Sequence, residues 1–286
     1  MLKNYMTLLL GIFVFYSCNE KNEIPSTPKE TQTKKEAEKK ASINYTLLIS
    51  KDSIKKFIKR TDSNSLKIIA AINRADVKFL IRFDSIIIPS DLSQPINQYF
   101  PFPFEASFLK DIKKIIFFSY PTQSFAAYEN GMLIYTGPTS MGRKADTTPT
   151  GLFYTNWKAE QSTSTFNDEW DLKWNFNIEN KLGVGFHQYE MPGYPASHSC
   201  LRLSEKDAKY LYEWADQWTI KGTDNILAQG TPVIVYGSYP FGRSKPWLAL
   251  AQNEKALDIN SADLENTVKQ YLPDIMQKQA QRDSIK

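Results

Sequence analysis

The sequence predicts a mainly β, α+β fold: a β-sandwich with one packed helix, preceded by a small α/β unit. Three patterns lead to this prediction. Residues from about 110 to 238 contain short runs of β-branched and aromatic residues separated by turn-forming residues. One amphipathic helical pattern follows Ser204. Two helical patterns and one strand pattern occupy residues 44–92.

The first 43 residues are predicted to be a targeting segment and a tether. Residues 1–17 combine a positively charged start with an apolar run that is too short to span a bilayer. The run ends directly before Cys18 and resembles a bacterial lipoprotein signal, which implies cleavage there and a lipid on the sulfur. An ordinary secretory signal is the alternative. Residues 18–43 contain too few large apolar side chains to offset their ordering entropy, so we expect a disordered tether.

The unit at residues 44–92 is predicted to contain two helices and a closing strand. Asp52 or Ser53 is expected to cap a short helix that runs through Arg60. A second helix fits residues 66–72, and a strand fits residues 84–89. The opening strand of the unit is poorly marked.

The region from residue 110 to 238 is predicted to form the β-sandwich. A buried strand is expected at 114–120, and strands 124–129 and 132–136 form a hairpin across Asn130-Gly131, which tolerates positive φ. Further strands are predicted at four places: 151–155, 172–176, 184–187 and 232–236. Ser204 and Asp207 form a variant capping box that begins the packed helix. Its apolar stripe is expected to comprise Ala208, Leu211, Ala215 and Trp218, before an end at Lys221-Gly222.

The C-terminal extension, residues 239–286, is predicted to contain a docking helix or frayed tail at 260–285, interrupted at Pro273. The chain has 35 Lys and Arg against 31 Asp and Glu, a formal net charge of +4. Because this balance is mild and evenly mixed, it does not indicate a nucleic-acid partner.

The chain's only two histidines, His187 and His198, lie just upstream of Cys200. A neutral thiol is a poor nucleophile, and imidazole is the side chain that can deprotonate it near neutral pH. The cluster therefore predicts a cysteine nucleophile beside its base. The alternatives are a structural zinc site, for which a fourth ligand is not evident, and a disulfide between Cys18 and Cys200.

The run Ser197-His-Ser-Cys-Leu-Arg-Leu203 resembles the signature of the L,D-transpeptidase (YkuD-type) family, in which Ser/Thr-His-Gly-Cys precedes an Arg or Asn. The resemblance extends over Asn130-Gly131, Pro138–Arg143 and Thr148–Phe153, and covers roughly residues 113–237. Ser199 departs from the usual Gly, so its backbone is expected to avoid the conformation that only Gly tolerates. The interval between His187 and His198 is also shorter than is usual in the family. The unit at 44–92 more weakly resembles a LysM module, which binds glycan in its own family; a structural cap is the alternative.

The resemblance implies a role for each residue of the cluster. Cys200 is the nucleophile, ionised by His187 as base, and the backbone carbonyl of Gln188 or Tyr189 completes the relay. His198 and Ser199 shape the pocket, amides near Ser199 and Cys200 form an oxyanion hole, and Arg202 binds a substrate carboxylate or braces the loop. Tryptophans between the motifs are expected to line the cleft or to be core: Trp157, Trp170 and Trp174. No metal or organic cofactor is implied.

The implied function is a peptidoglycan L,D-transpeptidase of the cell envelope, anchored to a membrane by lipid and facing the periplasm or the cell wall. It acts on peptidoglycan stem peptides and transfers an acyl group from a tetrapeptide stem through a thioester to an amine acceptor, which forms a 3→3 crosslink. The alternatives are an L,D-carboxypeptidase that trims tetrapeptide stems and a non-catalytic wall-binding lipoprotein. The family is also acylated by carbapenems, which predicts an adduct on Cys200.

Overall fold

The computed structural model describes residues 40–163, 171–223 and 225–285. Cys18, the predicted signal and most of the predicted tether lie outside the described residues. Within the described ranges, no helix is both long and apolar enough to cross a membrane.

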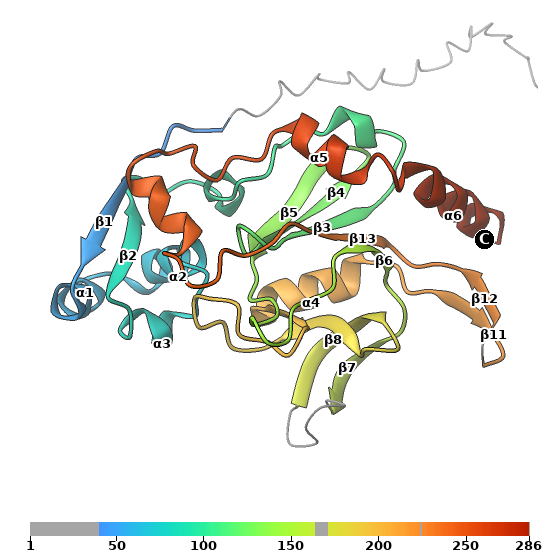
Figure 1. Cartoon of the computed structure of the whole chain (residues 1–286), viewed down its shortest axis with the longest axis horizontal. Helices are drawn as coiled ribbons and strands as arrows, with labels where there is room; N and C mark the ends of the chain where they lie inside the picture. The colour runs from blue at the N-terminus through green and yellow to red at the C-terminus, as the bar shows by residue number, and fades with distance from the viewer. Residues whose placement is uncertain (1–39, 164–170, 224, 286) are drawn as a thin grey trace, which may run out of the picture. The chain divides into compact units, whose positions relative to one another are not determined.

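The N-terminal unit is a two-stranded sheet packed on helices (Figure 1). Its elements in order are β1 (Tyr45–Ile49), α1 (Lys51–Ile58), α2 (Ser63–Ile72), α3 (Val77–Leu80) and β2 (Ser85–Pro89). β1 and β2 pair antiparallel, so the poorly marked opening strand is present. Ser50, and not Asp52 or Ser53, caps α1, because its side chain accepts the Ser53 N–H. Ile54, Ile69 and Ile86 form the centre of the unit's core.

A five-stranded sheet has the order β5-β4-β3-β13-β6. Its strands are β3 (Ile115–Ser119), β4 (Ser124–Glu129), β5 (Met132–Pro138), β6 (Gly151–Tyr154) and β13 (Pro232–Tyr236). β13 runs parallel to β3, and the other pairs are antiparallel. Asn130 and Gly131 both have positive φ, 47° and 79°, which is the turn that matches strand twist in a tight hairpin. The predicted hairpin is confirmed.

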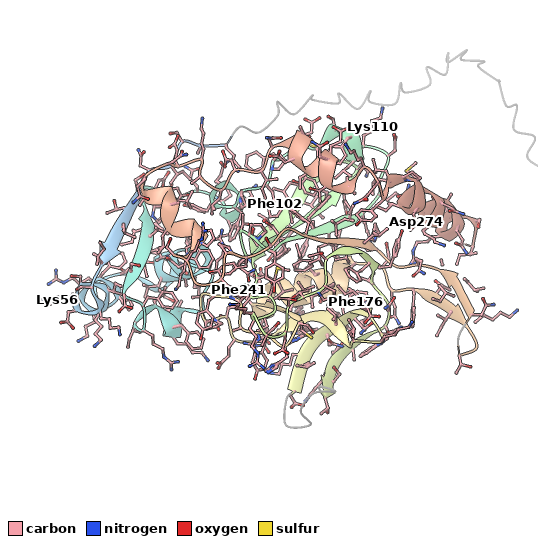
Figure 2. The ribbon with its side chains drawn as sticks, viewed as in Figure 1. Lys56, Phe102, Lys110, Phe176, Phe241 and Asp274 are labelled. Carbon is pink, nitrogen blue, oxygen red and sulfur yellow. The ribbon has the colours of Figure 1, made fainter. Side chains whose placement is uncertain are left out.

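A second sheet has the order β10-β9-β8-β7 and includes one parallel pair, β9 with β10. Its strands are β7 (Lys158–Thr163), β8 (Asp171–Glu179), β9 (Val184–Gln188) and β10 (Leu201–Leu203). Helix α4 (Glu205–Trp214) lies between the two sheets (Figure 1). Phe176, labelled in Figure 2, packs in this core with Phe118, Phe186 and Leu211.

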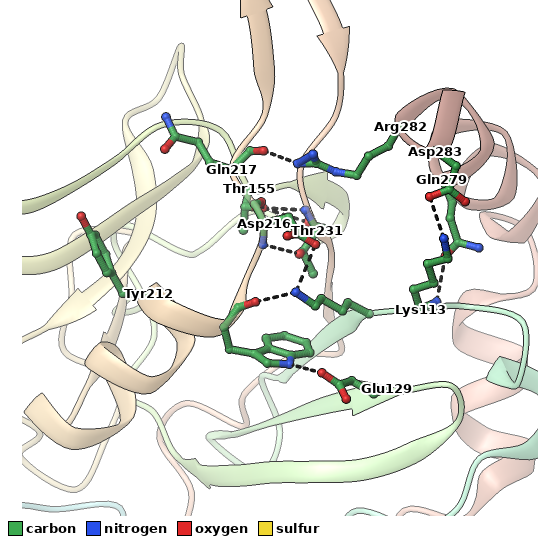
Figure 3. A network of polar contacts seen from close by, with 12 residues as sticks. Lys113, Glu129, Thr155, Tyr212, Asp216, Gln217, Thr231, Gln279, Arg282 and Asp283 are labelled. Atoms are coloured by element: carbon green, nitrogen blue, oxygen red, sulfur yellow. Dashed lines mark hydrogen bonds and ion pairs between the residues drawn. The ribbon is translucent and has the colours of Figure 1, made fainter. Parts of the chain in front are cut away.

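Helix α4 ends earlier than the sequence predicts. Ser204 caps it by accepting the Asp207 N–H, as expected. The helix stops at Trp214, so Trp218 lies outside it, next to the short β11 (Thr219–Lys221) that pairs with β12 (Asn225–Ala228). Asp216 donates its N–H to Thr231 Oγ1 at 2.8 Å and accepts from Thr155 Oγ1 at 2.5 Å (Figure 3). These bonds to distant strands take the place of a further helical turn.

The outer face of the five-stranded sheet is covered by C-terminal helices, as the docking-helix alternative for residues 260–285 predicted. After the 3₁₀ turn at Pro246–Ala251, the helices are α5 (Ser261–Val268) and α6 (Leu272–Ser284). Leu264, Val268 and Ile275 pack against Phe117 and Ile234. The interruption between α5 and α6 comes before Pro273. This proline lies in the first turn of α6, where the N–H that it lacks would have no partner within the helix.

Polar contacts fasten α6 to the strand region. Gln279 accepts the Lys113 N–H at 2.8 Å, and Lys113 Nζ lies 2.6 Å from Asp283 (Figure 3). Arg282 donates to the carbonyl of Gln217. The C-terminal stretch is therefore docked on the protein.

Packing begins within the last residues of the predicted tether. Ala41 donates its N–H to Gln98 Oε1 at 2.7 Å, and Ser42 donates to Glu254 at 2.9 Å. Ile43 is 4% exposed and joins a core with Trp247. A free tether therefore does not extend to residue 43.

Candidate active site

The parallel pairing of β9 and β10 brings the cysteine and the first histidine to one face of the second sheet. Leu201 is level with Phe186, and Arg202 is level with His187. Since Leu201 and Phe186 point into the core, the alternate residue His187 faces the other way. Cys200 directly precedes β10, and continuing the same alternation by one residue puts it on the face of His187. Ideal strand geometry, with a spacing of about 4.8 Å and a rise of about 3.3 Å per residue, corresponds to a Cα separation of roughly 8 Å.

The hydrogen bond of His187 defines its tautomer. Its Nδ1 lies 2.9 Å from the carbonyl oxygen of Gln188. A carbonyl only accepts, so Nδ1 carries the proton and Nε2 has the free lone pair. The ring is 4% exposed, and this burial lowers the pKa of His187 to about 4, a shift that nearby Arg202 increases and the Gln188 carbonyl opposes. His187 is therefore a neutral proton acceptor at pH 7.

The thiol of Cys200 is also uncharged in the resting site. Its Sγ lies 3.7 Å from the carbonyl of Gly183, to which the S–H donates. Burial raises the pKa of Cys200, while the Gly185 N–H and Arg202 oppose the rise. Together with the depressed pKa of His187, this favours a neutral pair over the ionised sulfur that the sequence suggested. The cause is desolvation, which penalises both charges.

Ser199 adopts the left-handed conformation that the sequence analysis expected it to avoid. Its φ is 85°, a value that favours Gly, so that expectation was wrong. Two hydrogen bonds fix the turn: Thr148 donates to the carbonyl of Ser199 at 2.8 Å, and Ser197 donates to that of Cys200 at 2.5 Å. Strain of this kind costs roughly 1–3 kcal/mol and persists only where its surroundings impose it.

The upstream motifs lie against the cysteine loop. Ser140 and Arg202 exchange two backbone hydrogen bonds of 3.1 Å each, and Thr148 Oγ1 accepts the Gly142 N–H at 2.9 Å. A side chain at Gly142 would place its Cβ 2.2 Å from the carbonyl of Asp146, so only glycine fits. The two upstream segments that resemble the family, Pro138–Arg143 and Thr148–Phe153, thus include the supports of this loop.

The Arg202 side chain contacts the residues that follow His187. Its guanidinium lies 4.5 Å from the ring centroid of Tyr189 and donates through Nη1 to the carbonyl of Glu190 at 3.3 Å. Tyr189 donates its N–H to the carbonyl of Leu203. Of the two predicted relay carbonyls, that of Gln188 contacts Nδ1. His198 is half-buried between Ser197 and Ser199.

Two glycines near the sulfur were not identified from the sequence. Gly183 and Gly185 contact Cys200, and a Cβ on Gly185 would lie 2.6 Å from the carbonyl of Phe176. The Gly183-Val-Gly185 spacing, which ends two residues before His187, is the signal that was available.

The tryptophans between the motifs have different surroundings. Trp174 packs on the core with an edge contact to Tyr212, whereas Trp157 is 38% exposed and donates to Asn180. Trp170 lies outside the described residues. The ranges that the structure describes contain no group of three or more His, Cys, Asp or Glu side chains that could hold a metal ion.

A thiol and a buried, neutral imidazole with an oriented tautomer, carried by neighbouring strand ends, are groups that suit a cysteine nucleophile and its base. Residues 113–235 match the family model of the L,D-transpeptidase catalytic domain, YkuD. The similarity to this family is confined to that segment, which is less than half of the chain. A search of the curated proteins found no match.

Among solved structures, the chain is similar to three L,D-transpeptidases. For that of Stackebrandtia nassauensis the identity is 20%, the coverage 66% of this chain and 78% of the other, and the TM-score 0.38. The enzyme of Mycobacterium smegmatis is 18% identical, the match covers 44% of this chain and 59% of the other, and the TM-score is 0.35. One enzyme of Mycobacterium tuberculosis is 20% identical, the match covers 44% of this chain and 58% of the other, and the TM-score is 0.35. The chain thus spans less than two thirds of the length of both mycobacterial proteins.

Proposed function

We propose that this chain is a peptidoglycan L,D-transpeptidase in which Cys200 is the nucleophile and His187 is its base. The observation that carries the proposal is the orientation of His187. Its Nδ1–H donates to the Gln188 carbonyl, so Nε2 is free to accept a proton on the face that Cys200 shares. The family match supports the class of reaction.

The first half of the proposed reaction makes a thioester. The sulfur attacks the carbonyl carbon of the third residue of a tetrapeptide stem while the thiol proton passes to His187 Nε2. The C–N bond to the terminal D-Ala then breaks, and the leaving nitrogen takes that proton. Because both partners are neutral at rest, opposite charges develop together during attack and stabilise each other.

The second half transfers the stem. The side-chain amine of another stem's diamino acid attacks the thioester carbon and gives its proton to His187 Nε2. The new C–N bond forms, the C–S bond breaks, and the sulfur recovers the proton. The thioester conserves the energy of the cleaved peptide bond, so the reaction needs no nucleotide.

The remaining site residues are proposed to bind and orient the stem. Amides near Ser199 and Cys200 act as the oxyanion hole, a donor set whose loss typically costs about 100-fold or more in rate. His198 and Ser199 shape the pocket. The contacts of Arg202 with Tyr189 and Glu190 favour a bracing role over binding of a substrate carboxylate.

The N-terminal features complete the proposal for the whole protein. Residues 1–17 are a lipoprotein signal, Cys18 bears the lipid, and the protein works in the cell envelope, held to a membrane. Two of the three helices between β1 and β2, α1 and α2, with the antiparallel strand pair that closes residues 45–89, support a LysM-like unit that contacts glycan; the third helix, α3, has four residues.

The test is incubation with defined tetrapeptide muropeptides, with products weighed by mass spectrometry. A 3→3 dimer that appears with the wild type and not with Cys200→Ala supports the transpeptidase. A trimmed tripeptide without dimer assigns the carboxypeptidase reaction instead. Equal binding of peptidoglycan by both proteins, with no new product, assigns a non-catalytic wall-binding role and refutes the proposal.

A further inference from the structure

The chain between the histidine and the cysteine is clamped to the N-terminal unit. We call residues 189–194 the linking segment. Asp76 donates its N–H to the carbonyl of Met191 at 2.8 Å, and Met191 donates its N–H to Asp76 Oδ2 at 3.0 Å. Ala75 and Pro192 form an isolated antiparallel bridge beside this pair. Two opposed hydrogen bonds fix both the position and the direction of the linking segment.

A tight apolar contact reinforces the clamp. Gly193 has a φ of 82°, and a Cβ built on it would lie 2.3 Å from the Phe83 ring. The other side of the clamp is charged: Lys245 Nζ lies 3.5 Å from the centroid of the same ring, and Lys78 forms an exposed ion pair with Glu190. The exposed ion pair adds little, so Asp76 and Phe83 are the main contacts.

The carboxylate of Asp76 accepts a hydrogen bond from the linking segment and none from its own helix. Asp76 occupies the N-cap position of α3, where an Asp side chain ordinarily accepts a first-turn N–H, yet it makes no such bond. Its oxygen instead accepts from Met191, across 115 residues of sequence. Charge-assisted bonds of this kind are about twice as strong as neutral ones.

The opposite end of the linking segment contacts the candidate site. The Arg202 guanidinium lies over the Tyr189 ring and donates to the Glu190 carbonyl. Arg202 is two residues from Cys200 and level with His187 in the sheet. A shift of the linking segment is therefore transmitted to both members of the proposed pair.

We propose that Asp76 is a positioning residue of the active site: together with Phe83, it fixes the linking segment and thereby Tyr189, Arg202 and the approach of the stem to Cys200. The N-terminal unit is then part of the catalytic apparatus, whether or not it also binds glycan. The effect on activity rests on the proposed function; the effect on the linking segment does not.

The test compares three variants by hydrogen exchange and kinetics. Asp76→Ala removes the acceptor for Met191, whereas Asp76→Asn keeps a side-chain oxygen there. Asp62→Ala is the matched control, because Asp62 also accepts two backbone N–H groups in the same unit, but at α2, away from the linking segment. We expect amide exchange in residues 189–194 to rise about tenfold in Asp76→Ala and to stay within about twofold of wild type in the other two.

With muropeptide substrate, Asp76→Ala is expected to raise KM about tenfold with a smaller change in kcat, and Asp76→Asn to restore most of the loss. Unchanged exchange in 189–194, or an equal kinetic loss in Asp62→Ala, would overturn the proposal. If the wild type turns over no substrate, the proposed function fails, and the exchange experiment still decides the clamp.

A second pair of variants tests the same clamp from its apolar side. Gly193→Ala inserts a methyl group against Phe83 and is expected to raise exchange in 189–194 as Asp76→Ala does. The double variant Gly193→Ala with Phe83→Leu makes room for the methyl group, so amide exchange in residues 189–194 should fall part of the way back to the wild-type rate. No gain in exchange from Gly193→Ala, in a protein that remains folded, would also contradict the clamp.

Discussion

The burial of a neutral His187 makes the stability of the protein depend on pH in a defined window. The pKa of His187 is about 4 in the folded chain and near 6.5 when unfolded. Between these values the unfolded state binds more protons, so the free energy of unfolding rises with pH. The contribution is fully present above pH 6.5, falls as the pH decreases, and is lost below pH 4. Over the whole window it amounts to about 3 kcal/mol.

At pH 5.0 the same linkage predicts a loss of about 2 kcal/mol relative to pH 7.5. The assay is urea unfolding of the wild type and His187→Gln at both values, with His198→Gln as the control. The wild type and the control should lose about 2 kcal/mol more than His187→Gln does. An equal loss in all three proteins would refute the neutral, buried imidazole on which the proposed mechanism depends.

Three further predictions concern the cysteine loop. Ser199→Gly relieves a left-handed backbone, so it is expected to raise the free energy of unfolding by about 1 kcal/mol in urea titration, and a variant less stable than wild type would contradict the strain. Because burial raises the pKa of Cys200, its alkylation by iodoacetamide should be slow at pH 7 and accelerate above pH 8.5; a rate already at its maximum at pH 6 would indicate a preformed ion pair. A carbapenem is expected to add its mass to the wild type and not to Cys200→Ala, and an intact mass without the adduct would count against an open site.

The parts of the fold that the sequence predicted are those with local signals. Asn130-Gly131 between two apolar runs defined a hairpin, and Ser204 with Asp207 marked the start of α4. The end of α4 was not predictable in this way, because Asp216 leaves the helix to bond with Thr155 and Thr231, which are distant in sequence. The packing of α5 and α6 depends likewise on the sheet face that they cover.

The candidate site also has features with a local sequence signal and features that depend on distant residues. The cluster of His187, His198 and Cys200 is visible in the sequence because the residues are rare and close together. The charge state of the pair is not visible, because desolvation is a property of the folded surroundings. The left-handed Ser199 depends on Thr148, and the clamp joins Asp76 to Met191; neither partner is recognisable from the sequence near the cysteine.

The central claim is that Cys200, deprotonated by His187, forms a thioester with a stem peptide. The most direct measurement is rapid-quench mass spectrometry with a tetrapeptide donor and no acceptor, followed by mapping of the modified peptide. We predict an adduct on Cys200 with the mass of the donor less D-Ala, absent in Cys200→Ala and formed at least about 100-fold more slowly in His187→Gln. Turnover of the donor by Cys200→Ala, or an unchanged rate in His187→Gln, would contradict it.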